Sequence, residues 1–514
     1  MITTPSHPID IAGAETPSPG SPRRPLKPEG SVMPWAQRLI LVATCVSLGA
    51  VVSAVTSLNV ALPDLARATR ASTTELQWIV AAYALVFAGL LLPAGALGDR
   101  LGRRRVLLAG LVVFGGGALV ATSLSDPTTL IGVRAAMGVG AALIMPSTLS
   151  IITSTFPEHT RDRAVGVWAG VAGGSALVGL LASGLLLEAF SWSSVFALNA
   201  ALALAGAALT LRFVPAGVPQ PVPLDAGGAA LSALSLAGLV YGFIEGPDRG
   251  WASISVVAAF AAGILLLGAF VAWELRRDEP MLDPRLFRLR GFASGSLSVF
   301  VQFFALFGTI FVLLQYLQFV LRYDPLQAGA ALAPTALIMV ALAPRVPRLT
   351  ARFGASRVGP AGLALMAAGL IVAATMGVGA SYWHLLAALG PIGVGMALAA
   401  TPATAAIVGA LPDDKQGVAS AVNDTAREVG GALGIAVLGS VLASHAGHLG
   451  VRPDPSAIVA GYQSALHVGA GALVAGALLF LASGAHDDVS HRRRRRWPGR
   501  QRAPRAHACH EAPR

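Results

Sequence analysis

Arg134 is the one arginine or lysine that falls well inside a long apolar run of this sequence. A charged side chain within a membrane-spanning helix costs roughly 2.5–3.5 kcal/mol on insertion scales, so it needs a partner or a water-filled cavity. Proton transfer is one use of such a residue, in which Arg134 tunes or exchanges with a nearby carboxylate. The alternative is that the side chain extends to the outer membrane interface, since its run starts only about five residues earlier.

A proton carrier would be an acidic side chain at or near membrane depth. The first choice is Glu245, near the end of an apolar run. Asp424 and Glu428 lie near the start of another run, where Arg427 can pair with Asp424 three residues away. Each carboxylate has an alternative use as an interfacial charge, and so do Asp64 and Glu188 at outer run ends. His467 could titrate near neutral pH, or simply pack within its helix.

Recognition of a small amphipathic molecule would need apolar and aromatic side chains with a few hydrogen-bonding groups at mid-depth. Gln302 is a single polar residue in a stretch rich in phenylalanine. Hydrogen bonding between helices is the alternative use of each candidate. The candidate binding residues are Asn59, Trp78, Tyr83, Gln302, Gln315, Tyr316 and Gln318.

These side chains belong to a chain of 514 residues that is 54% hydrophobic and only 12% charged, with a mean hydropathy of +0.67. Such values exclude an ordinary cytosolic enzyme, a disordered regulator and a disulfide scaffold. The runs lack the alternation of a membrane barrel, so helices must position the side chains. Fourteen runs are long enough to span a bilayer: 37–62, 76–98, 106–124, 129–152, 163–187, 194–214, 226–245, 251–273, 293–319, 327–349, 357–378, 383–410, 424–444 and 461–483.

The distribution of positive charge predicts the orientation of these spans. With the N-terminus in the cytoplasm, the cytoplasmic loops and tails hold 31 of the 37 basic residues, counting Arg427 with the loop before its run. The split predicts that both termini are cytoplasmic and that the chain is a multi-pass protein of the plasma membrane. The net charge of +11 therefore indicates contact with the lipid bilayer and not with nucleic acid. The outer loops hold only Arg67, Arg70, Arg249, Arg322 and Arg452.

A weak internal repeat predicts the domain organisation. Leu97, Arg100 and Gly102 match Leu349, Arg352 and Gly354 in sequence order. Two related six-helix bundles would explain this match, as in transporters that open a central site to each side in turn. We expect a disordered cytoplasmic tail at 1–34, bundles at 35–214 and 293–485, two inserted helices with a loop at 215–292, and a basic disordered tail at 486–514.

The stretch from Gly95 to Arg105 resembles the signature loop between spans 2 and 3 of the major facilitator superfamily. Its glycines would let two helices turn and pack tightly, and its aspartate could pair with arginines or a helix N-terminus. The resemblance implies a clasp that keeps the cytoplasmic side closed; a plain positively charged loop is the alternative. The gating residues it assigns are Gly95, Gly98, Asp99, Arg100, Gly102 and Arg103.

Further stretches resemble the fourteen-span drug:proton antiporter branch of that superfamily. They are 59–63, 77–83, 130–140 with Arg134, 241–251 with Glu245, 315–318 and 417–423. The resemblance implies an all-α membrane protein that exports amphipathic drugs or antibiotics by proton antiport and alternating access. Its partners would be the small molecule and protons, without a cofactor or a metal. We expect a monomer that is not an enzyme.

Three motifs depart from the pattern of that branch. Ala54 stands where span 1 usually carries an aspartate, and Trp192 is followed by Ser193 instead of arginine. In span 5, Leu180 replaces a proline and Ser183 a glycine, so the helix should be straighter. The pairs Gly166/Gly170 and Gly179/Gly184 still permit close helix packing.

Other functions stay open on the sequence alone. A narrow exporter or uniporter of an endogenous metabolite would fit the missing aspartate of span 1. A non-transporting receptor is a remote alternative. A membrane enzyme or an ATP-driven pump is disfavoured, because the sequence has no phosphate-binding loop and no nucleophile or zinc-binding motif of the usual forms.

Overall fold

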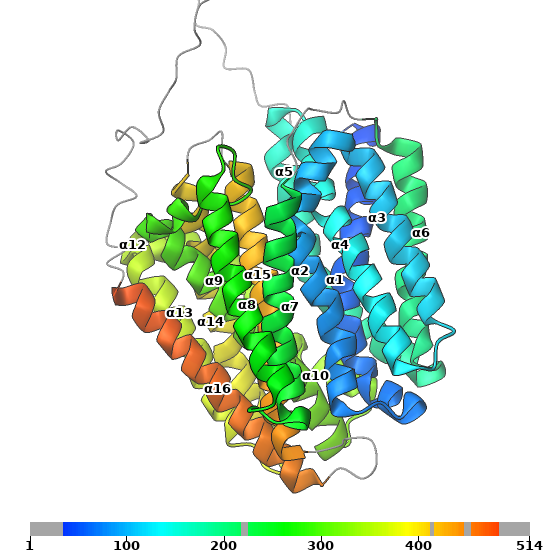
Figure 1. Ribbon diagram of the computed structural model, residues 1–514, viewed down its shortest axis with the longest axis vertical. Helices are drawn as coiled ribbons and strands as arrows, with labels where there is room; N and C mark the ends of the chain where they lie inside the picture. Colours follow the sequence, from blue (N-terminus) through cyan, green and yellow to red (C-terminus); the bar gives the residue numbers. More distant parts are fainter. Residues whose placement is uncertain (1–33, 217–224, 412–415, 447–453, 483–514) are drawn as a thin grey trace, which may run out of the picture.

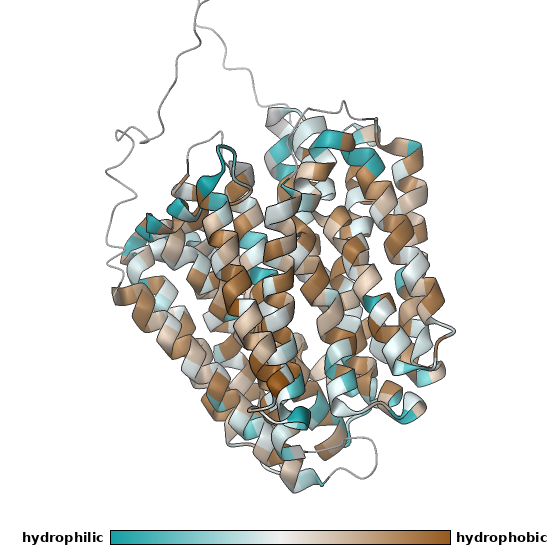
Figure 2. Ribbon diagram, viewed as in Figure 1, coloured by the Kyte–Doolittle hydropathy of each residue, from teal (hydrophilic) through white to brown (hydrophobic). Residues whose placement is uncertain are grey.

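The computed structural model describes residues 34–216, 225–411, 416–446 and 454–482, which are helical almost throughout. Apart from Pro34, the predicted tails lie outside the described residues. Figure 1 shows a bundle of long helices, and Figure 2 shows apolar residues along their middle parts. Within the described segments, fourteen helical spans are long enough and apolar enough to cross a membrane. The fourteen predicted spans are therefore confirmed.

The first six spans form one group of helices. In this group α1 packs against α5 and α6, while α4 packs against α2 and α3. The bounds are α1 (Trp35–Thr69), α2 (Thr73–Leu101), α3 (Arg103–Ala121), α4 (Pro127–Thr155), α5 (Glu158–Ala189) and α6 (Ser193–Phe213).

The remaining spans comprise a helix pair and a second group. The pair α7 (Ala226–Arg249) and α8 (Ile254–Arg276) is followed by the short η1 (Pro284–Arg288). In the second group α9 packs against α14 and α15, and α13 against α14 and α16. Its bounds are α9 (Arg290–Gln315), η2 (Tyr316–Val320), α10 (Pro325–Ala331), α11 (Ala333–Leu342), η3 (Ala343–Arg345), α12 (Val346–Phe353), α13 (Ala355–Ala374), α14 (Tyr382–Gly409), α15 (Gln416–Ala446) and α16 (Pro455–Ala482).

Local sequence explains where several helices start. Ser72 and Glu75 form a reciprocal capping box at the start of α2. At α4 the Asp126 carboxylate accepts hydrogen bonds of 2.6 and 2.7 Å from the Thr129 hydroxyl and backbone N–H, ahead of Pro127 in the first turn. These bonds hold the pKa of Asp126 below its usual value. Gly102 and Gly354 both separate two helices at positive φ, 94° and 85°, so the two positions matched by the repeat share one turn geometry.

The bundle has two ends. The Trp35 face is the end at which α1 begins and α2 ends, and the Thr69 face is the opposite end. Helix α7 contacts α2 of the first group and α15 of the second, and Figure 1 shows it running between them. The two groups also meet directly, because α2 packs against α15 and α5 against α10. These contacts place polar side chains of α15, and polar side chains of α2 and α7, at the boundary between the two groups.

Candidate functional site

A buried charge cluster of Asp424, Arg427 and Glu428 lies on α15. Arg427 makes ion pairs of 3.4 Å with Asp424 and 3.2 Å with Glu428. The Glu428 side chain is only 8% exposed, and those of Asp424 and Arg427 are 17% and 21% exposed. Arg427 follows the first residue of α15 by about 16 Å along the helix axis, at 1.5 Å per residue. The cluster therefore lies within the span and is partly accessible.

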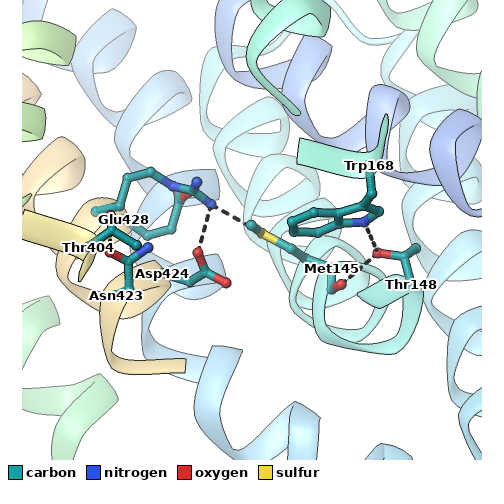
Figure 3. A network of polar contacts seen from close by, with 8 residues as sticks. Met145, Thr148, Trp168, Thr404, Asn423, Asp424 and Glu428 are labelled. Carbon is teal, nitrogen blue, oxygen red and sulfur yellow. Dashed lines mark hydrogen bonds and ion pairs between the residues drawn. The ribbon is translucent and has the colours of Figure 1, made fainter. Parts of the chain in front are cut away.

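The cluster faces the first group of helices. Arg427 contacts the Met145 sulfur of α4 at 3.6 Å, and its guanidinium lies 5.7 Å from the centre of the Phe303 ring of α9. Figure 3 shows Met145 between Asp424 and Trp168. Trp168 of α5 donates a 3.1 Å hydrogen bond to the Thr148 hydroxyl of α4. Charge, sulfur and aromatic rings thus meet at the boundary between the two groups.

The charges of the cluster do not balance when both carboxyl groups are ionised. One guanidinium then faces two carboxylates and leaves a formal charge of −1; binding one proton makes the cluster neutral. A net charge is costly within a span, so this arrangement can take up a proton. It can equally be neutralised by a cation that approaches the carboxylates.

The structure corrects the charge census at Arg427. Hydropathy predicts that the span starts at 424 and assigns this arginine to the preceding loop, because polar residues near 424 lower the local hydropathy. Helix α15 begins at Gln416 instead, so Arg427 joins Arg134 as a second arginine inside a span. The spacing of Asp424, Arg427 and Glu428 at i, i+3 and i+4 was the signal that could have ranked this cluster first. Met145 and Trp168 carried no such signal.

Arg134 of α4 lies in a different environment. It is 1% exposed, so its side chain does not extend to the membrane interface as one alternative required. Its Nε donates to the Ile79 carbonyl at 3.0 Å, and the guanidinium lies 4.2 Å from the centre of the Tyr83 ring. No ion pair joins Arg134 to a carboxylate among the described residues, and one terminal nitrogen lacks a partner there.

Glu245 of α7 holds the helix pair against α2. Its carboxylate accepts a 2.8 Å hydrogen bond from the Trp78 indole and pairs with Arg249 at 2.5 Å. One turn away, Thr74 donates to Asp248 at 2.5 Å, and Ser440 of α15 donates to the Phe243 carbonyl. Two predicted site residues, Trp78 and Glu245, are therefore brought together, but at the contact between α7 and α2.

The predicted gating loop binds within the first group. Asp99 pairs with Arg103 at 2.9 Å, and Arg103 donates to the Ser150 carbonyl of α4 at 2.8 Å. An added Cβ at Gly95 or Gly98 would lie 3.8 or 3.6 Å from α4 atoms, so both glycines lie beside that helix. Arg100 is exposed. In this conformation the loop ties α2 and α3 to α4, and Asp99 makes no ion pair with the described residues of the second group.

Three of the seven predicted binding residues are buried amides with spare hydrogen-bonding capacity. Gln302 donates to the Ser298 hydroxyl, Gln315 to the Phe311 carbonyl and Asn59 to the Val55 carbonyl. The amide oxygens of Asn59, Gln302 and Gln315 have no partner among the described residues. These three residues are predicted to share one binding site, but the hydrogen bonds of their side chains stay within their own helices.

The other three binding candidates have structural partners. The Tyr83 hydroxyl donates to the Val51 carbonyl at 3.0 Å. Tyr316 donates to the Gly377 carbonyl at 2.6 Å and stacks on Tyr462 with ring centres 4.4 Å apart. Gln318 of η2 donates to the Val60 carbonyl of α1 at 3.1 Å, which links the two groups near the Thr69 face.

Helix α5 approaches the second group only toward the Thr69 face. A Cβ added to Gly184 would lie 2.6 Å from the Leu326 Cα of α10, and one added to Gly179 would lie 2.9 Å from Ser53 of α1. At Gly166 and Gly170 an added Cβ would meet nothing within 4 Å. The close packing that the spacing permits is therefore present at Gly179 and Gly184 but not at Gly166 and Gly170, which face open space in this conformation.

His467 is exposed on α16, so the alternative that it packs within the bundle was wrong. Ala54 is fully buried in α1, and it leaves this part of the span without a carboxylate.

Comparison with known proteins gives the family. The family model for the Major Facilitator Superfamily matches residues 40–435 and 295–507. The methyl viologen resistance protein SmvA of Salmonella typhimurium is 36% identical over 75% of this chain and 79% of its own. The puromycin resistance protein pur8 of Streptomyces alboniger is 36% identical over 82% of this chain and 86% of its own. The methylenomycin A resistance protein of Streptomyces coelicolor is 34% identical over 76% and 82%.

Solved structures agree in fold. The POT family transporter PepTSo aligns over 87% of this chain and 98% of its own with a TM-score of 0.65, at 16% identity. A bacterial homologue of the lysosomal transporter Spinster, solved in an inward-facing state, aligns with a TM-score of 0.62 at 15% identity. With fourteen candidate membrane spans and a family match across most of its length, this chain belongs to the Major Facilitator Superfamily.

Proposed function

We propose that this protein is a secondary transporter that exports amphipathic small molecules, drugs or antibiotics, from the cytoplasm in exchange for protons. The names of the relatives, which are resistance proteins, support the substrate class. The observation that carries proton exchange is the Asp424–Arg427–Glu428 cluster, whose charge changes from −1 to 0 when one proton binds. We assign coupling to this cluster in preference to Glu245, whose carboxylate is occupied by Trp78 and Arg249.

The surroundings of the cluster suggest which substrates it would accept. Met145 and Phe303 offer polarizable and aromatic surface, and the two carboxylates offer negative charge once the proton has left. A molecule with an apolar body and a positive group could satisfy both. Such a substrate and a proton would then compete for the same carboxylates, which is the requirement for exchange.

Alternating access would follow from the boundary contacts. Toward the Thr69 face the groups meet through Gly184 and Leu326 and through Gln318 and Val60, whereas Gly166 and Gly170 face open space. The charge distribution supports a cytoplasmic Trp35 face, with both termini on that side of the plasma membrane. The partly exposed cluster would then release its proton toward the cytoplasm in this conformation, and reopening would require the Thr69-face contacts to part.

The organisation that we propose is two six-helix bundles, 35–214 and 293–485, with α7 and α8 inserted between them. The protein would work as a monomer without enzymatic activity. A uniporter or exporter of one endogenous metabolite is the second candidate, because Ala54 is buried where span 1 would carry a carboxylate, and Arg134 pairs with no carboxylate among the described residues. Uniport would show no dependence on a proton gradient.

Uptake into inverted membrane vesicles, driven by an imposed proton gradient, tests this function. Uptake of ethidium, an amphipathic cation, should continue after ATP depletion and should collapse when a protonophore is added. Vesicles without the protein measure passive entry. Concentrative uptake that persists after the protonophore would exclude proton exchange, and equilibration without concentration would favour uniport.

A further inference from the structure

A buried carboxyl group lies at the end of α8 and is not part of the charge cluster of α15. Glu274 is fully buried, with 0% of its surface exposed, and its Oε2 atom accepts a 3.3 Å hydrogen bond from the Leu282 backbone N–H. As a carboxylate oxygen, its Oε1 atom has no donor among the described residues. A buried acceptor without a donor costs free energy, so the ionised form of Glu274 is poorly accommodated.

The Oε1 atom of Glu274 faces a second carboxyl group. Asp225 is the N-cap residue of α7, the helix that packs along α8 (Figure 1). A Cβ added to Gly228 would collide with Glu274 Oε1 and would lie 2.8 Å from Asp225 Oδ2, so the two oxygens converge over this glycine. Two carboxylates cannot hydrogen-bond to each other, whereas a carboxylic acid donates one hydrogen bond to a carboxylate. One proton shared by the pair would therefore satisfy the Oε1 atom.

Asp225 is the partner that stays ionised. Burial alone would raise its pKa, but hydrogen bonds and a positive charge outweigh this effect and hold the pKa of Asp225 below its usual value. The bonds come from the Gly228 backbone N–H at 2.8 Å and the Trp273 indole at 3.0 Å, and the charge is that of Arg277 at 3.2 Å. The shared proton is therefore carried by Glu274 and donated to Asp225.

The other charged groups near Glu274 leave this position to the proton. On the segment 277–289, which joins α8 to α9, Arg285 donates to the Leu275 carbonyl at 3.1 Å, and Asp283 accepts from the Arg285 backbone N–H. Further charged side chains of α8 and this segment are exposed: Arg276, Asp278, Glu279 and Arg288. Within the described part of the chain, no ion pair reaches Glu274 and no third acidic, histidine or cysteine side chain completes a metal site.

The carboxyl pair anchors the joining segment 277–289 on α15. Glu274 holds this segment through the Leu282 backbone N–H. Four residues later, Leu286 is 3% exposed and belongs to one buried cluster with Ala419 and Val422 of α15, and Leu282 packs against this cluster. A change at Glu274 would therefore reach the contact between the joining segment and α15.

We propose that Asp225 and Glu274 form a proton-dependent latch, in which one shared proton keeps the joining segment closed against α15. When the proton leaves, two adjacent carboxylates face the single guanidinium of Arg277 and repel each other. Glu274 then turns toward water and releases Leu282. Proton binding stabilises the closed segment, so this stabilisation is present at low pH and is lost as the pH rises. The latch goes beyond the export function, since it would respond to pH whether or not a substrate moves.

Hydrogen–deuterium exchange of the full-length protein in lipid nanodiscs tests the latch. Labelling times are scaled at each pH so that an unprotected amide exchanges to the same extent. We expect the peptide that contains 281–289 to be protected at pH 5.5 and to exchange faster toward pH 8.5, by at most about tenfold per pH unit for one proton. Glu274→Gln keeps a donor for Asp225 and an acceptor for Leu282 without a titrating proton, so it should stay protected at every pH.

Two control variants and a second measurement accompany this experiment. Glu279→Gln removes an exposed carboxylate from the same segment and should keep the wild-type pH dependence. Glu428→Gln should keep it too, because the coupling cluster is separate. In infrared spectra, the carbonyl band of a protonated carboxylic acid should disappear from the wild-type protein over the pH range in which the segment begins to exchange, and Glu274→Gln should lack this band.

Three results would overturn the proposal. The first is wild-type protection that does not change with pH, and the second is a pH dependence that Glu274→Gln leaves unaltered. The third is protection at alkaline pH that returns when Mg²⁺ or Na⁺ is added, because a metal cation would then be the ligand of the carboxyl pair in place of a proton.

Discussion

Each half of this transporter buries one arginine inside a span, and the two arginines have opposite surroundings. Arg134 of α4 rests on the Tyr83 ring and the Ile79 carbonyl without an ion pair to a described carboxylate. Arg427 of α15 pairs with both Asp424 and Glu428. A guanidinium among neutral groups stays charged, whereas a guanidinium with two carboxylates gives a cluster that can gain or lose a proton.

The difference indicates that the two halves have unequal roles in coupling. The first half lacks the span 1 carboxylate, since Ala54 is buried there, and its arginine cannot exchange a proton with a paired acid. The second half supplies both the acid and the counter-charge. Proton binding would then bias the contact between α15 and α4 at Met145, where the two halves meet.

Arg427→Ala should have the largest effect. It would leave two buried carboxylates without a counter-charge, and breaking such a pair costs about 3 kcal/mol when some exposure remains. We expect a lower thermal unfolding midpoint in detergent and loss of export. The unfolding midpoint should recover toward the wild-type value at acidic pH, because protonated carboxyl groups need no counter-charge. A destabilisation that is equal at pH 5 and pH 8 would contradict this explanation.

Arg134→Ala should have a smaller effect on stability than Arg427→Ala. It removes a hydrogen bond and a cation–π contact, worth about 1–3 kcal/mol together, but strands no paired carboxylate. Export should fall at least tenfold while the shape of its pH profile stays as in the wild type. A shifted profile, measured at equal membrane abundance, would return Arg134 to the proton pathway.

Glu245→Gln should have the smallest effect of the three. Glutamine keeps an acceptor for the Trp78 indole and loses the pair with Arg249, and a pair of this i,i+4 type contributes about 0.3–0.5 kcal/mol. Export and its pH dependence should match the wild type within twofold. An altered pH profile would restore Glu245, the first choice from sequence, as the coupling residue.

Much of the fold could be predicted from sequence, because each membrane span is one long, continuous apolar stretch of the chain. Hydropathy located all fourteen spans, and the repeat located the glycine turns at Gly102 and Gly354. Asp424 and Glu428 were candidates for the proton carrier but ranked behind Glu245, because the polar residues around them resemble the end of a span. Contacts such as Gln318 to Val60 join residues far apart in the chain, and one sequence contains no signal for them. Spacing alone also does not decide packing, since the motif is present at Gly166 and Gly170 but an added Cβ would meet nothing within 4 Å at either position.

The most direct test of the account is substrate-driven proton movement in proteoliposomes that contain pyranine. Ethidium added to the wild-type protein should produce a proton flux, and Glu245→Gln should give the same flux. Glu428→Gln fixes the uncharged state of one carboxyl group, so it should weaken ethidium binding, measured by fluorescence anisotropy, and should abolish the proton flux even when ethidium is saturating. Proton flux of wild-type size in Glu428→Gln would contradict the assignment of coupling to α15.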